Sequence, residues 1–314
     1  MAKTLDQWRW VIIAPEAEIN KWTAAFLAVN PQLLLEVGPA VTDPETVDVL
    51  LLWNHPKGCL TPFINVKVYY SLGAGVDHLL SDESIYNAIP ICRIVDPLLS
   101  FSMTNYILFA VLYHQRRWEK YLSDRQNKQW DHDAPSEEKI TIGILGLGTL
   151  GSDAARKLAH LGFKVIGYSP SKKKIQNIKT FQEGELNSFL KHCNVLVCTV
   201  PYTEKTHGLL SMSLFSKLPS KAYLINVSRG HVQVEEDIIK ALDLNYLSGA
   251  FLDVFEREPL PISSPLWEHP KVQITPHIAS ITNPQAGVNQ ICQNIIKLQK
   301  GEKPDFRVNY DKGY

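Results

Sequence analysis

Short apolar runs alternate with longer amphipathic segments along the first hundred residues. Residues 10–14, 47–53, 66–70 and 91–95 each have the length and the apolar content of a buried strand. Residues 16–30, between the first two runs, place apolar side chains at the spacing of an amphipathic helix. Strands that alternate with helices predict an α/β domain with a parallel sheet.

The same alternation returns in the second half of the chain, after a long segment of helical composition. Residues 98–130 contain no proline and end in a polar part, so we predict that a helix there links two domains. A last helix is predicted after Asn283-Pro284 and is expected to pack on the first domain. The length of 314 residues also favours two domains.

The stretch from Thr141 to Gly151 reads T-I-G-I-L-G-L-G-T-L-G and joins a predicted strand to a predicted helix. Its last three glycines have G-x-G-x-x-G spacing, and residues 163–168 supply the next strand of a βαβ unit. Such a turn lets the backbone approach a pyrophosphate and points helix N–H groups at it. Glycines also mark ordinary loops, but the flanking strand and helix favour a dinucleotide site. The predicted phosphate-binding residues are Gly146, Leu147, Gly148, Thr149, Leu150 and Gly151.

The residues after the second strand of this unit indicate which dinucleotide binds. An acidic residue there usually binds the ribose hydroxyls of NAD, whereas a cationic group accommodates the 2′-phosphate of NADP. This chain has Ser169 and Ser171 followed by Lys172, Lys173 and Lys174, with no carboxylate at the NAD position. We therefore predict a preference for NADP(H), with NAD(H) possible. The alternative is that the lysines form a solvated surface run.

Composition and charge narrow the class of partner. Lys plus Arg equals Asp plus Glu at 32 each, so no net charge draws the chain to nucleic acid or to an anionic membrane. We expect a small-molecule substrate, no nucleic acid and no membrane. The five cysteines form no C-x-x-C or His/Cys cluster, so neither a disulfide framework nor a metal site is predicted. Without an apolar signal core or an 18-residue apolar span, the expected location is cytoplasmic.

Three polar residues in the second half follow predicted strands, at the edge where a Rossmann crevice opens. Arg229 lies in I-N-V-S-R-G, Glu258 in L-D-V-F-E-R-E-P and His277 in I-T-P-H-I-A. Each has a simpler alternative: a surface charge, a turn residue or a core histidine. Together, downstream of a dinucleotide turn, they favour hydride transfer to a 2-keto acid.

These residue types meet the requirements of that reaction beside the nicotinamide. The Arg229 guanidinium can bind a carboxylate bidentately and polarise the adjacent carbonyl. His277 can donate a proton to the developing alkoxide, and the Glu258 carboxylate would favour its protonated form. Asp253 ends a strand predicted over 248–253, where it could contact the nicotinamide carboxamide or simply cap the strand.

A second glycine-containing turn lies in the first half of the chain. Residues 71–77 read S-L-G-A-G-V-D, a strand end that leads into a turn and a helix. Backbone N–H groups at such a turn can bind a carboxylate without a charged side chain. The alternative is that the glycines only shape the turn.

With these motifs the chain resembles the D-isomer-specific 2-hydroxyacid dehydrogenases, most closely their glyoxylate/hydroxypyruvate reductase A branch. Ser169 departs from the aspartate of many NAD-using members, and Ser228 stands where alanine is common. The motifs that carry the resemblance are L-G-A-G-V-D at 72–77, G-L-G-T-L-G at 146–151, N-V-S-R-G at 226–230, L-D-V-F-E-R-E-P-L-P at 252–261 and T-P-H-I-A at 275–279.

The resemblance implies roles for individual residues. Arg229 and His277 would be the catalytic pair, with Glu258 behind the histidine. Further cofactor contacts would come from Pro201, Val227, Ser228 and Asp253, in addition to Ser169, Ser171 and Lys172. The implied substrate-binding residues are Arg229 with Trp53, Leu72, Gly73, Ala74 and Gly75, although Trp53 could instead belong to the core.

The resemblance also implies the architecture and the reaction. A flavodoxin-like substrate domain would comprise residues 1–98 and 283–314, and a Rossmann cofactor domain residues 99–282, with the linking helix at about 98–130. The site would lie in the cleft between them, and the family is typically a homodimer. The expected reaction is NADPH-dependent reduction of glyoxylate to glycolate and of hydroxypyruvate to D-glycerate. The alternatives are an NADH-linked dehydrogenase of a larger 2-keto acid and a cofactor-sensing binding protein without catalysis.

Overall fold

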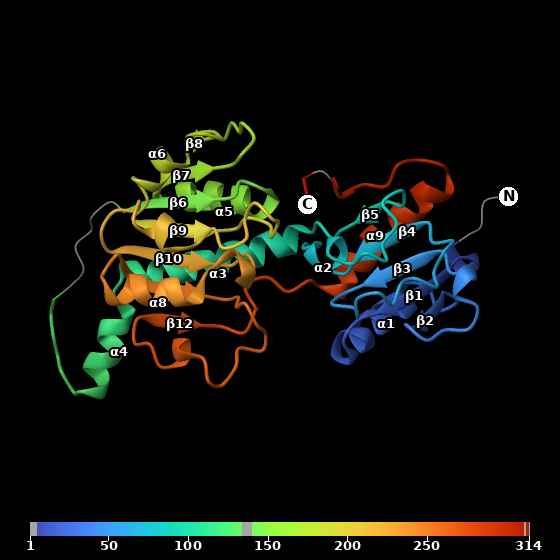
Figure 1. The fold of residues 1–314 in the computed structure, drawn as a ribbon, viewed down its shortest axis with the longest axis horizontal. Coiled ribbons are helices and arrows are strands. Elements are labelled where there is room, and N and C mark those ends of the chain that lie inside the picture. Colours follow the sequence, from blue (N-terminus) through green and yellow to red (C-terminus); the bar gives the residue numbers. More distant parts are fainter. Residues whose placement is uncertain (1–4, 134–139, 311, 314) are drawn as a thin grey trace. The chain divides into compact units, whose positions relative to one another are not determined.

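The chain forms two compact α/β units (Figure 1). The computed structural model describes residues 5–133, 140–310, 312 and 313. The first unit comprises Met1–Leu99 and Ile281–Tyr314, and the second comprises Ser100–Ser280. Each unit is built around one parallel sheet with helices packed on it, which confirms the predicted α/β fold.

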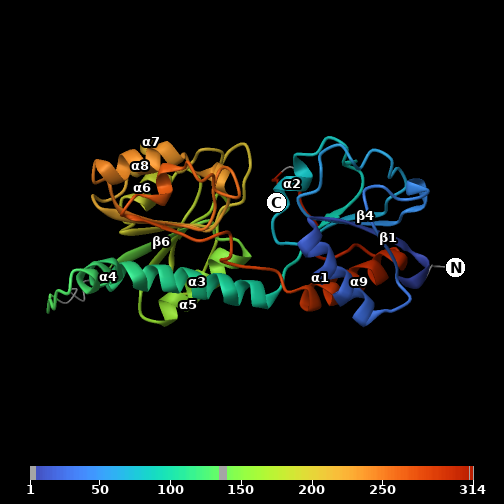
Figure 2. The same cartoon turned by 90° about the horizontal axis from the view of Figure 1, so that it is seen from below.

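The first unit has a sheet of flavodoxin-like strand order. Its elements are β1 Arg9–Ile13, α1 Glu16–Val29, β2 Leu34–Val37, β3 Val49–Leu52, β4 Val68–Ser71, α2 Asp77–Leu80, β5 Ile91–Cys92 and α9 Pro284–Gln299. The strand order is β2-β1-β3-β4-β5, and all neighbours are parallel. Helices α1 and α9 lie on one face, and the short α2 lies on the other (Figure 2). Gly287 permits the close packing of α9 on α1, because a Cβ there would lie 2.5 Å from the ring of Trp22.

Two strands of this unit differ from what the hydrophobic pattern predicts. Strand β2 is not among the predicted strands, and at this edge of the sheet its Leu34 and Val37 are exposed. The apolar run at 91–95 pairs with β4 only over Ile91–Cys92. Beyond it, the N–H of Val95 donates to the side chain of Gln290 and not to a strand.

The second unit contains a seven-stranded sheet of Rossmann type. Its elements are α3 Pro97–Gln115, α4 Trp118–Gln126, β6 Thr141–Leu145, α5 Thr149–His160, β7 Lys164–Tyr168, β8 Lys179–Phe181, α6 Leu186–Leu190, β9 Val195–Cys198, α7 Met212–Phe215, β10 Ala222–Asn226, α8 Glu235–Asp243, β11 Leu247–Leu252 and β12 Val272–Ile274. The order is β12-β11-β10-β9-β6-β7-β8, all parallel. Helices α3 and α5 cover one face, and α6, α7 and α8 cover the other (Figure 2). The order reverses between β6 and β9, so a ligand crevice is expected at their carboxyl ends.

The predicted linking helix is interrupted. Helix α3 is followed by Arg117, whose φ of 52° is left-handed, and α4 then begins. A left-handed residue just past a helix is a common way for a helix to end. Lys120 of α4 pairs with Asp131 at 2.7 Å, so the polar residues after α4 fold back on it and do not extend the helix to residue 130.

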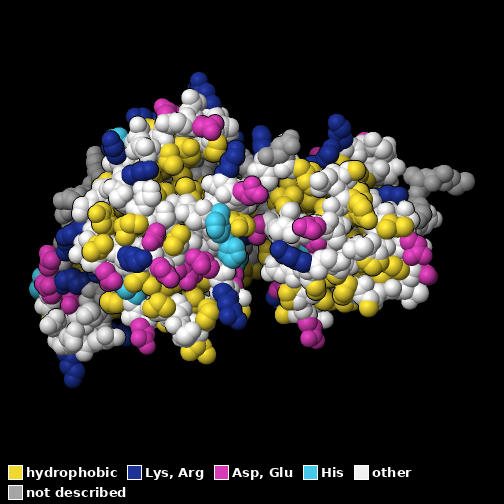
Figure 3. Space-filling view, viewed as in Figure 1, with side chains coloured by type: hydrophobic (Ala, Val, Ile, Leu, Met, Phe, Trp, Pro, Cys, Tyr) yellow, Lys and Arg dark blue, Asp and Glu magenta, His cyan; other side chains and the backbone are white. Residues whose placement is uncertain are grey.

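Charged side chains of both signs are mixed on the surface that Figure 3 shows, and the helices are too short or too polar to span a membrane in the described part of the chain. On the face in Figure 3, basic and acidic side chains are interspersed on both units, in agreement with their equal numbers in the sequence. None of the helices in the described part of the chain is long and apolar enough to cross a membrane.

Candidate active site

The turn between β6 and α5 carries the predicted phosphate loop. Gly146 has a φ of 109°, and a Cβ there would lie 2.9 Å from the backbone of Thr199. A Cβ on Gly151 would lie 2.0 Å from the carbonyl oxygen of Gly146. A Cβ on Gly148, in contrast, would meet nothing within 4 Å. The turn therefore packs tightly on the sheet and leaves open space at Gly148.

The N-terminus of α5 is arranged to bind an anion. The helix begins directly after Gly148, and no side chain of the described residues caps its first N–H groups. Uncapped N–H groups and the positive end of the helix dipole favour a phosphate at this place. The residues present thus fit the pyrophosphate of a dinucleotide.

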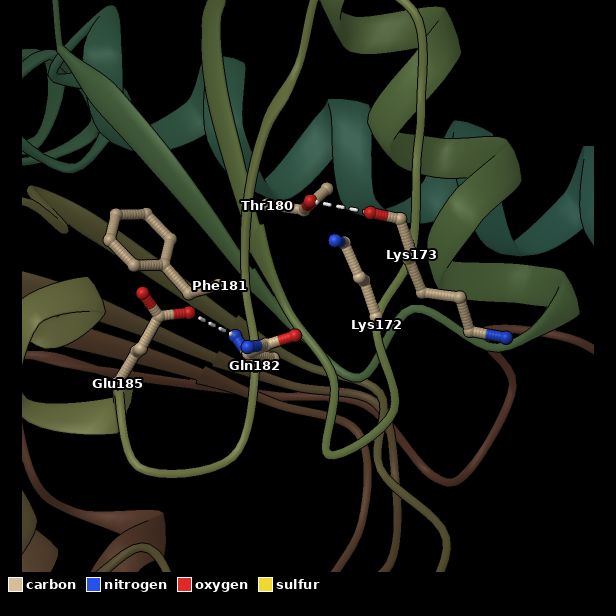
Figure 4. Close-up of a pocket in the computed structure, with 6 residues that line it drawn as sticks. All are labelled: Lys172, Lys173, Thr180, Phe181, Gln182 and Glu185. Atoms are coloured by element: carbon tan, nitrogen blue, oxygen red, sulfur yellow. Dashed lines mark hydrogen bonds between the residues drawn. The ribbon is translucent and has the colours of Figure 1, made fainter.

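The segment after β7 offers polar groups where the adenosine ribose is expected. Ser169 is buried, and its hydroxyl oxygen lies 3.5 Å from that of Ser171. Lys172 and Lys173 leave the loop in different directions in Figure 4. Both line a pocket of about 180 Å³, together with Thr180, Phe181, Gln182 and Glu185. The pocket therefore combines two ammonium groups with the Thr180 hydroxyl, the Gln182 amide and the Glu185 carboxylate, which accepts the N–H of Gln182 at 2.9 Å.

Glu258 and His277 form a hydrogen-bonded pair. Glu258 Oε2 lies 2.8 Å from His277 Nδ1, and Glu258 Oε1 accepts the N–H of Phe255 at 3.0 Å. Burial raises the pKa of the Glu258 carboxyl, but the hydrogen bond and charge of His277, the Phe255 N–H and the charge of Arg229 outweigh it and lower that pKa. Glu258 is therefore ionised at neutral pH. Because Nδ1 is bound to Glu258, Nε2 is the ring nitrogen that can face a ligand.

Asp253 holds the loop on which His277 lies. Its buried carboxylate accepts hydrogen bonds from Thr275 Oγ1 at 2.6 Å and from the N–H groups of Ile278 and Ala279 at 2.8 Å. These bonds flank His277 on both sides in the sequence and hold its left-handed backbone, which has a φ of 54°. Burial raises the pKa of Asp253, against the lowering effect of the same hydrogen bonds. Both carboxylate oxygens are used inside the protein, and a contact with the cofactor stays a prediction.

Arg229 follows β10 in a turn that a buried side chain organises. Asn226 Oδ1 accepts the N–H of Ser228 at 3.0 Å and its hydroxyl at 2.7 Å. Arg229 Nη1 donates to the carbonyl oxygen of Ser228 at 2.8 Å. A Cβ on Gly230 would lie 1.8 Å from the backbone of Phe255. The arginine turn therefore packs directly on the segment that leads to the glutamate of the pair.

The other predicted cofactor residues of this unit also lie at strand ends. Pro201 follows β9, and its carbonyl oxygen accepts the hydroxyl of Thr206 at 2.7 Å. Val227 follows β10, and its N–H donates to the carbonyl oxygen of Cys198 at 3.2 Å. These positions lie at the edge of the sheet where the crevice is expected.

Trp53 and the turn at 72–75 belong to the first unit. The Trp53 ring packs under this turn, since a Cβ on Gly73 would lie 2.5 Å from it. The ring of His78 lies 4.9 Å from the Trp53 ring, between centroids, in an edge-on arrangement. Trp53 is thus fixed against the turn that is expected to bind a carboxylate.

The backbone N–H groups of this turn differ in what they already bind. The N–H of Leu72 donates to a carbonyl oxygen of β3 at 3.0 Å, so it does not face a ligand. The N–H of Gly73 lies 3.3 Å from the hydroxyl oxygen of Ser71, a long contact. Among the described residues, no acceptor is seen for the N–H of Ala74 or Gly75. The structure narrows the expected carboxylate donors to Gly73, Ala74 and Gly75.

Sequence reasoning missed the residues that hold the site in place. Asn226 lies in the motif N-V-S-R-G and Thr275 in T-P-H-I-A. Their position inside these motifs is the sequence feature that could have pointed to them. Gln233 had no comparable signal, because its partners Asn226 and Val254 are 7 and 21 positions away. Polar side chains that are buried in this way are retained only when they are hydrogen-bonded.

Comparison with known proteins shows that the chain is similar to 2-hydroxyacid dehydrogenases in sequence and in structure. The profile described as "D-isomer specific 2-hydroxyacid dehydrogenase, NAD binding domain" matches residues 108–279. The glyoxylate/hydroxypyruvate reductase A of Serratia proteamaculans is 39% identical over 307 residues, which cover 96% of this chain and 98% of the relative. A D-isomer specific 2-hydroxyacid dehydrogenase from Xanthobacter autotrophicus Py2, in complex with NADPH and MES, has a TM-score of 0.92 at 35% identity and covers 98% of this chain and 99% of its own. The NADPH-dependent glyoxylate/hydroxypyruvate reductase of Sinorhizobium meliloti, in complex with NADP and sulfate, has a TM-score of 0.92 at 33% identity, with 98% and 100% covered.

Two alanine substitutions separate the packing of the glycine loop from its expected ligand. Gly151→Ala should lower the free energy of unfolding by about 1–3 kcal/mol, because its Cβ has no room. Gly148→Ala should leave that free energy unchanged and weaken NADPH binding on the order of tenfold, because its methyl group would fill the pyrophosphate space. Denaturant unfolding and NADPH titration measure the two effects. Unchanged NADPH affinity in Gly148→Ala would contradict the assignment.

Proposed function

The chain belongs to the D-isomer specific 2-hydroxyacid dehydrogenase family, and we propose that it reduces small 2-keto acids with NADPH. Glyoxylate would give glycolate, and hydroxypyruvate would give D-glycerate. The observation that carries this proposal is the 2.8 Å hydrogen bond between Glu258 and His277. These two residues follow β11 and β12, and Arg229 follows the neighbouring strand β10. The names of the Serratia and Sinorhizobium relatives support the choice of substrates.

The reaction follows from the roles of Arg229 and His277. When bound, NADPH supplies a hydride from its nicotinamide ring. Arg229 binds the substrate carboxylate and polarises the adjacent C2 carbonyl. His277 Nε2 would donate its proton to the carbonyl oxygen as negative charge develops on that oxygen. The 2-hydroxy acid leaves, and solvent returns a proton to the neutral imidazole.

Glu258 acts through His277. Its carboxylate accepts the Nδ1–H, orients the ring and stabilises the imidazolium that donates the proton. Because the pKa of Glu258 is lowered, this support is complete at neutral pH. It is lost in acid, as the pH falls through that lowered pKa and the carboxylate becomes protonated.

The first unit contributes to substrate binding in this proposal. The N–H groups of Gly73, Ala74 and Gly75 would bind the substrate carboxylate, and Trp53 would form a wall of the pocket. Leu72 would act through its place in the turn, since its N–H is bound to β3. The packing of the Trp53 ring against Gly73 supports the proposal that the ring and the turn bind the same substrate.

The cofactor would bind along the second unit. The pyrophosphate would lie at residues 146–151, and the open space at Gly148 supports this placement. The 2′-phosphate would lie at Ser169, Ser171 and Lys172, which is supported by the lysine-lined pocket and by the NADPH and NADP of the two solved neighbours. The nicotinamide end would be contacted by Pro201, Val227, Ser228 and Asp253.

The location proposed for this protein is the cytoplasm. All five cysteines are free thiols, and four of them are buried in the apolar interior. Free thiols of this kind are typical of proteins in reducing compartments.

Turnover measurements test the reaction. NADPH oxidation with glyoxylate and with hydroxypyruvate should proceed in the wild type, and pyruvate and NADH serve as comparison substrates. His277→Ala should lower kcat by roughly 10²–10⁴-fold, because the proton donor is lost. His231→Ala, a histidine substitution outside the pair, should retain wild-type kcat. If NADPH binds but is oxidised with none of these acceptors, the proposed reaction is overturned.

A triple substitution tests the cofactor preference. Ser169→Asp combined with Lys172→Ala and Lys173→Ala should shift the ratio of kcat/KM for NADPH over NADH toward NADH by roughly 10- to 100-fold, because charge-assisted bonds to the phosphate are removed. Lys174→Ala is the matched control, since Lys174 does not line the pocket. An unchanged ratio in the triple variant would rule out this phosphate site.

A homodimer is also proposed, formed through α3 and α4. The exposed apolar side chains of these helices support it: Phe101, Phe109, Leu112, Trp118 and Leu122. The mass in solution should be twice the chain mass of 35.5 kDa. Leu112→Asp combined with Trp118→Asp should reduce it to one chain, whereas the exposed control Leu244→Asp should not. A monomeric wild type would contradict the proposal.

A further inference from the structure

Gln233 is a buried glutamine that links the two halves of the site. Only 1% of its surface is exposed, and its carboxamide is hydrogen-bonded at both ends. Its Oε1 accepts from Asn226 Nδ2 at 2.8 Å, and its Nε2 donates to the carbonyl oxygen of Val254 at 2.9 Å. Asn226 precedes the arginine turn, and Val254 precedes the glutamate. One side chain therefore connects the segments after β10 and β11.

On the arginine side, Gln233 determines which way the Asn226 amide points. With Nδ2 directed at Gln233, Asn226 Oδ1 is directed at Ser228, whose N–H and hydroxyl it accepts. The Asn226 amide nitrogen also lies 3.4 Å from the carbonyl oxygen of Arg229. The turn that presents Arg229 is thus held from inside by an amide whose orientation Gln233 sets.

On the glutamate side, Gln233 holds a peptide group that Glu258 binds from its other edge. The Val254 carbonyl accepts from Gln233, and the N–H of the same peptide, that of Phe255, donates to Glu258 Oε1 at 3.0 Å. Because a peptide is planar, fixing its carbonyl also fixes the direction of its N–H. Glu258 Oε2 then contacts His277 Nδ1. Consecutive hydrogen bonds therefore run from Gln233 to the proton donor.

The backbone segments on either side of Gln233 are packed closely against the segment after β11, so the Gln233 side chain has little freedom to move. Gly230 packs on Phe255 at a distance that excludes any Cβ. The N–H of Glu256 donates to Glu235 at 2.9 Å, which ties the same segment to the start of α8. Gln233 lies between these two contacts in the sequence.

The amide of Gln233 satisfies both partners of this position because it carries an acceptor and a donor. Asn226 Nδ2 requires an acceptor, and the Val254 carbonyl requires a donor. An ionised glutamate offers no donor and would place an oxygen against the Val254 carbonyl. A leucine offers neither group and leaves both partners without their bond in a dry interior.

On the basis of the proposed function, we propose that Gln233 is a positioning residue, which holds the Arg229 turn and the Glu258–His277 pair in one productive geometry. Gln233 touches neither substrate nor cofactor in this role. It acts through Asn226 on one side and through the Val254–Phe255 peptide on the other.

Kinetics of Gln233→Leu and Gln233→Glu test the proposal on the full chain. Both variants should lower kcat for glyoxylate by roughly 10- to 100-fold, because small misplacements of catalytic groups have effects of this size. The KM for glyoxylate should rise, because the network holds the turn that presents Arg229. Gln273→Leu is the matched control: it removes a glutamine that donates to Glu119 at 3.0 Å, outside the network, and should leave kcat unchanged.

A measurement without substrate separates this proposal from the proposed function. The Nδ1–H signal of His277, observed by NMR at one fixed pH in the protein without cofactor, should shift or broaden in each folded Gln233 variant, because its hydrogen bond to Glu258 is held less well. Gln273→Leu should leave this signal at its wild-type position. An unchanged His277 signal in a folded Gln233 variant would overturn the positioning role, whatever the rates. A wild type without turnover would overturn the proposed function but would leave this NMR comparison decisive.

Discussion

The hydrogen bond between Glu258 Oε2 and His277 Nδ1 is the interaction on which the rest of the site depends. It determines which ring nitrogen can face a substrate, and it keeps a negative charge beside the imidazole. The segment after β11 holds both partners of this bond. Asp253 holds the loop of His277 through three hydrogen bonds, and the Phe255 N–H holds Glu258.

The parallel sheet explains how residues far apart in sequence come to act together. Strands β10, β11 and β12 are neighbours in register, so their carboxyl ends meet at one edge. Arg229, Glu258 and His277 each follow one of these strands. The expected cofactor loop lies at the same edge, after β6, where the strand order reverses. Strand order therefore brings these three side chains to one edge of the sheet.

Local patterns predicted the features that depend on local physics. The glycine loop, the strands around it and the last helix follow from apolar periodicity and glycine spacing, and the structure contains them. Strand β2 is missing from the prediction although residues 33–37 read L-L-L-E-V, because so short an apolar run does not by itself distinguish a strand from a helix segment. The end of α3 at a left-handed Arg117 breaks a segment whose composition is helical throughout. The role of Gln233 depends on partners in other segments, and no local pattern carries that information.

A deuterium label can be followed from the cofactor to the product. Hydroxypyruvate is reduced with NADPH that carries deuterium at both C4 positions of the nicotinamide, and the glycerate is analysed by mass and by chirality. Hydride transfer from the nicotinamide, with the proton on oxygen supplied by His277, should give D-glycerate with deuterium at C2. L-Glycerate, or glycerate without deuterium at C2, would contradict it.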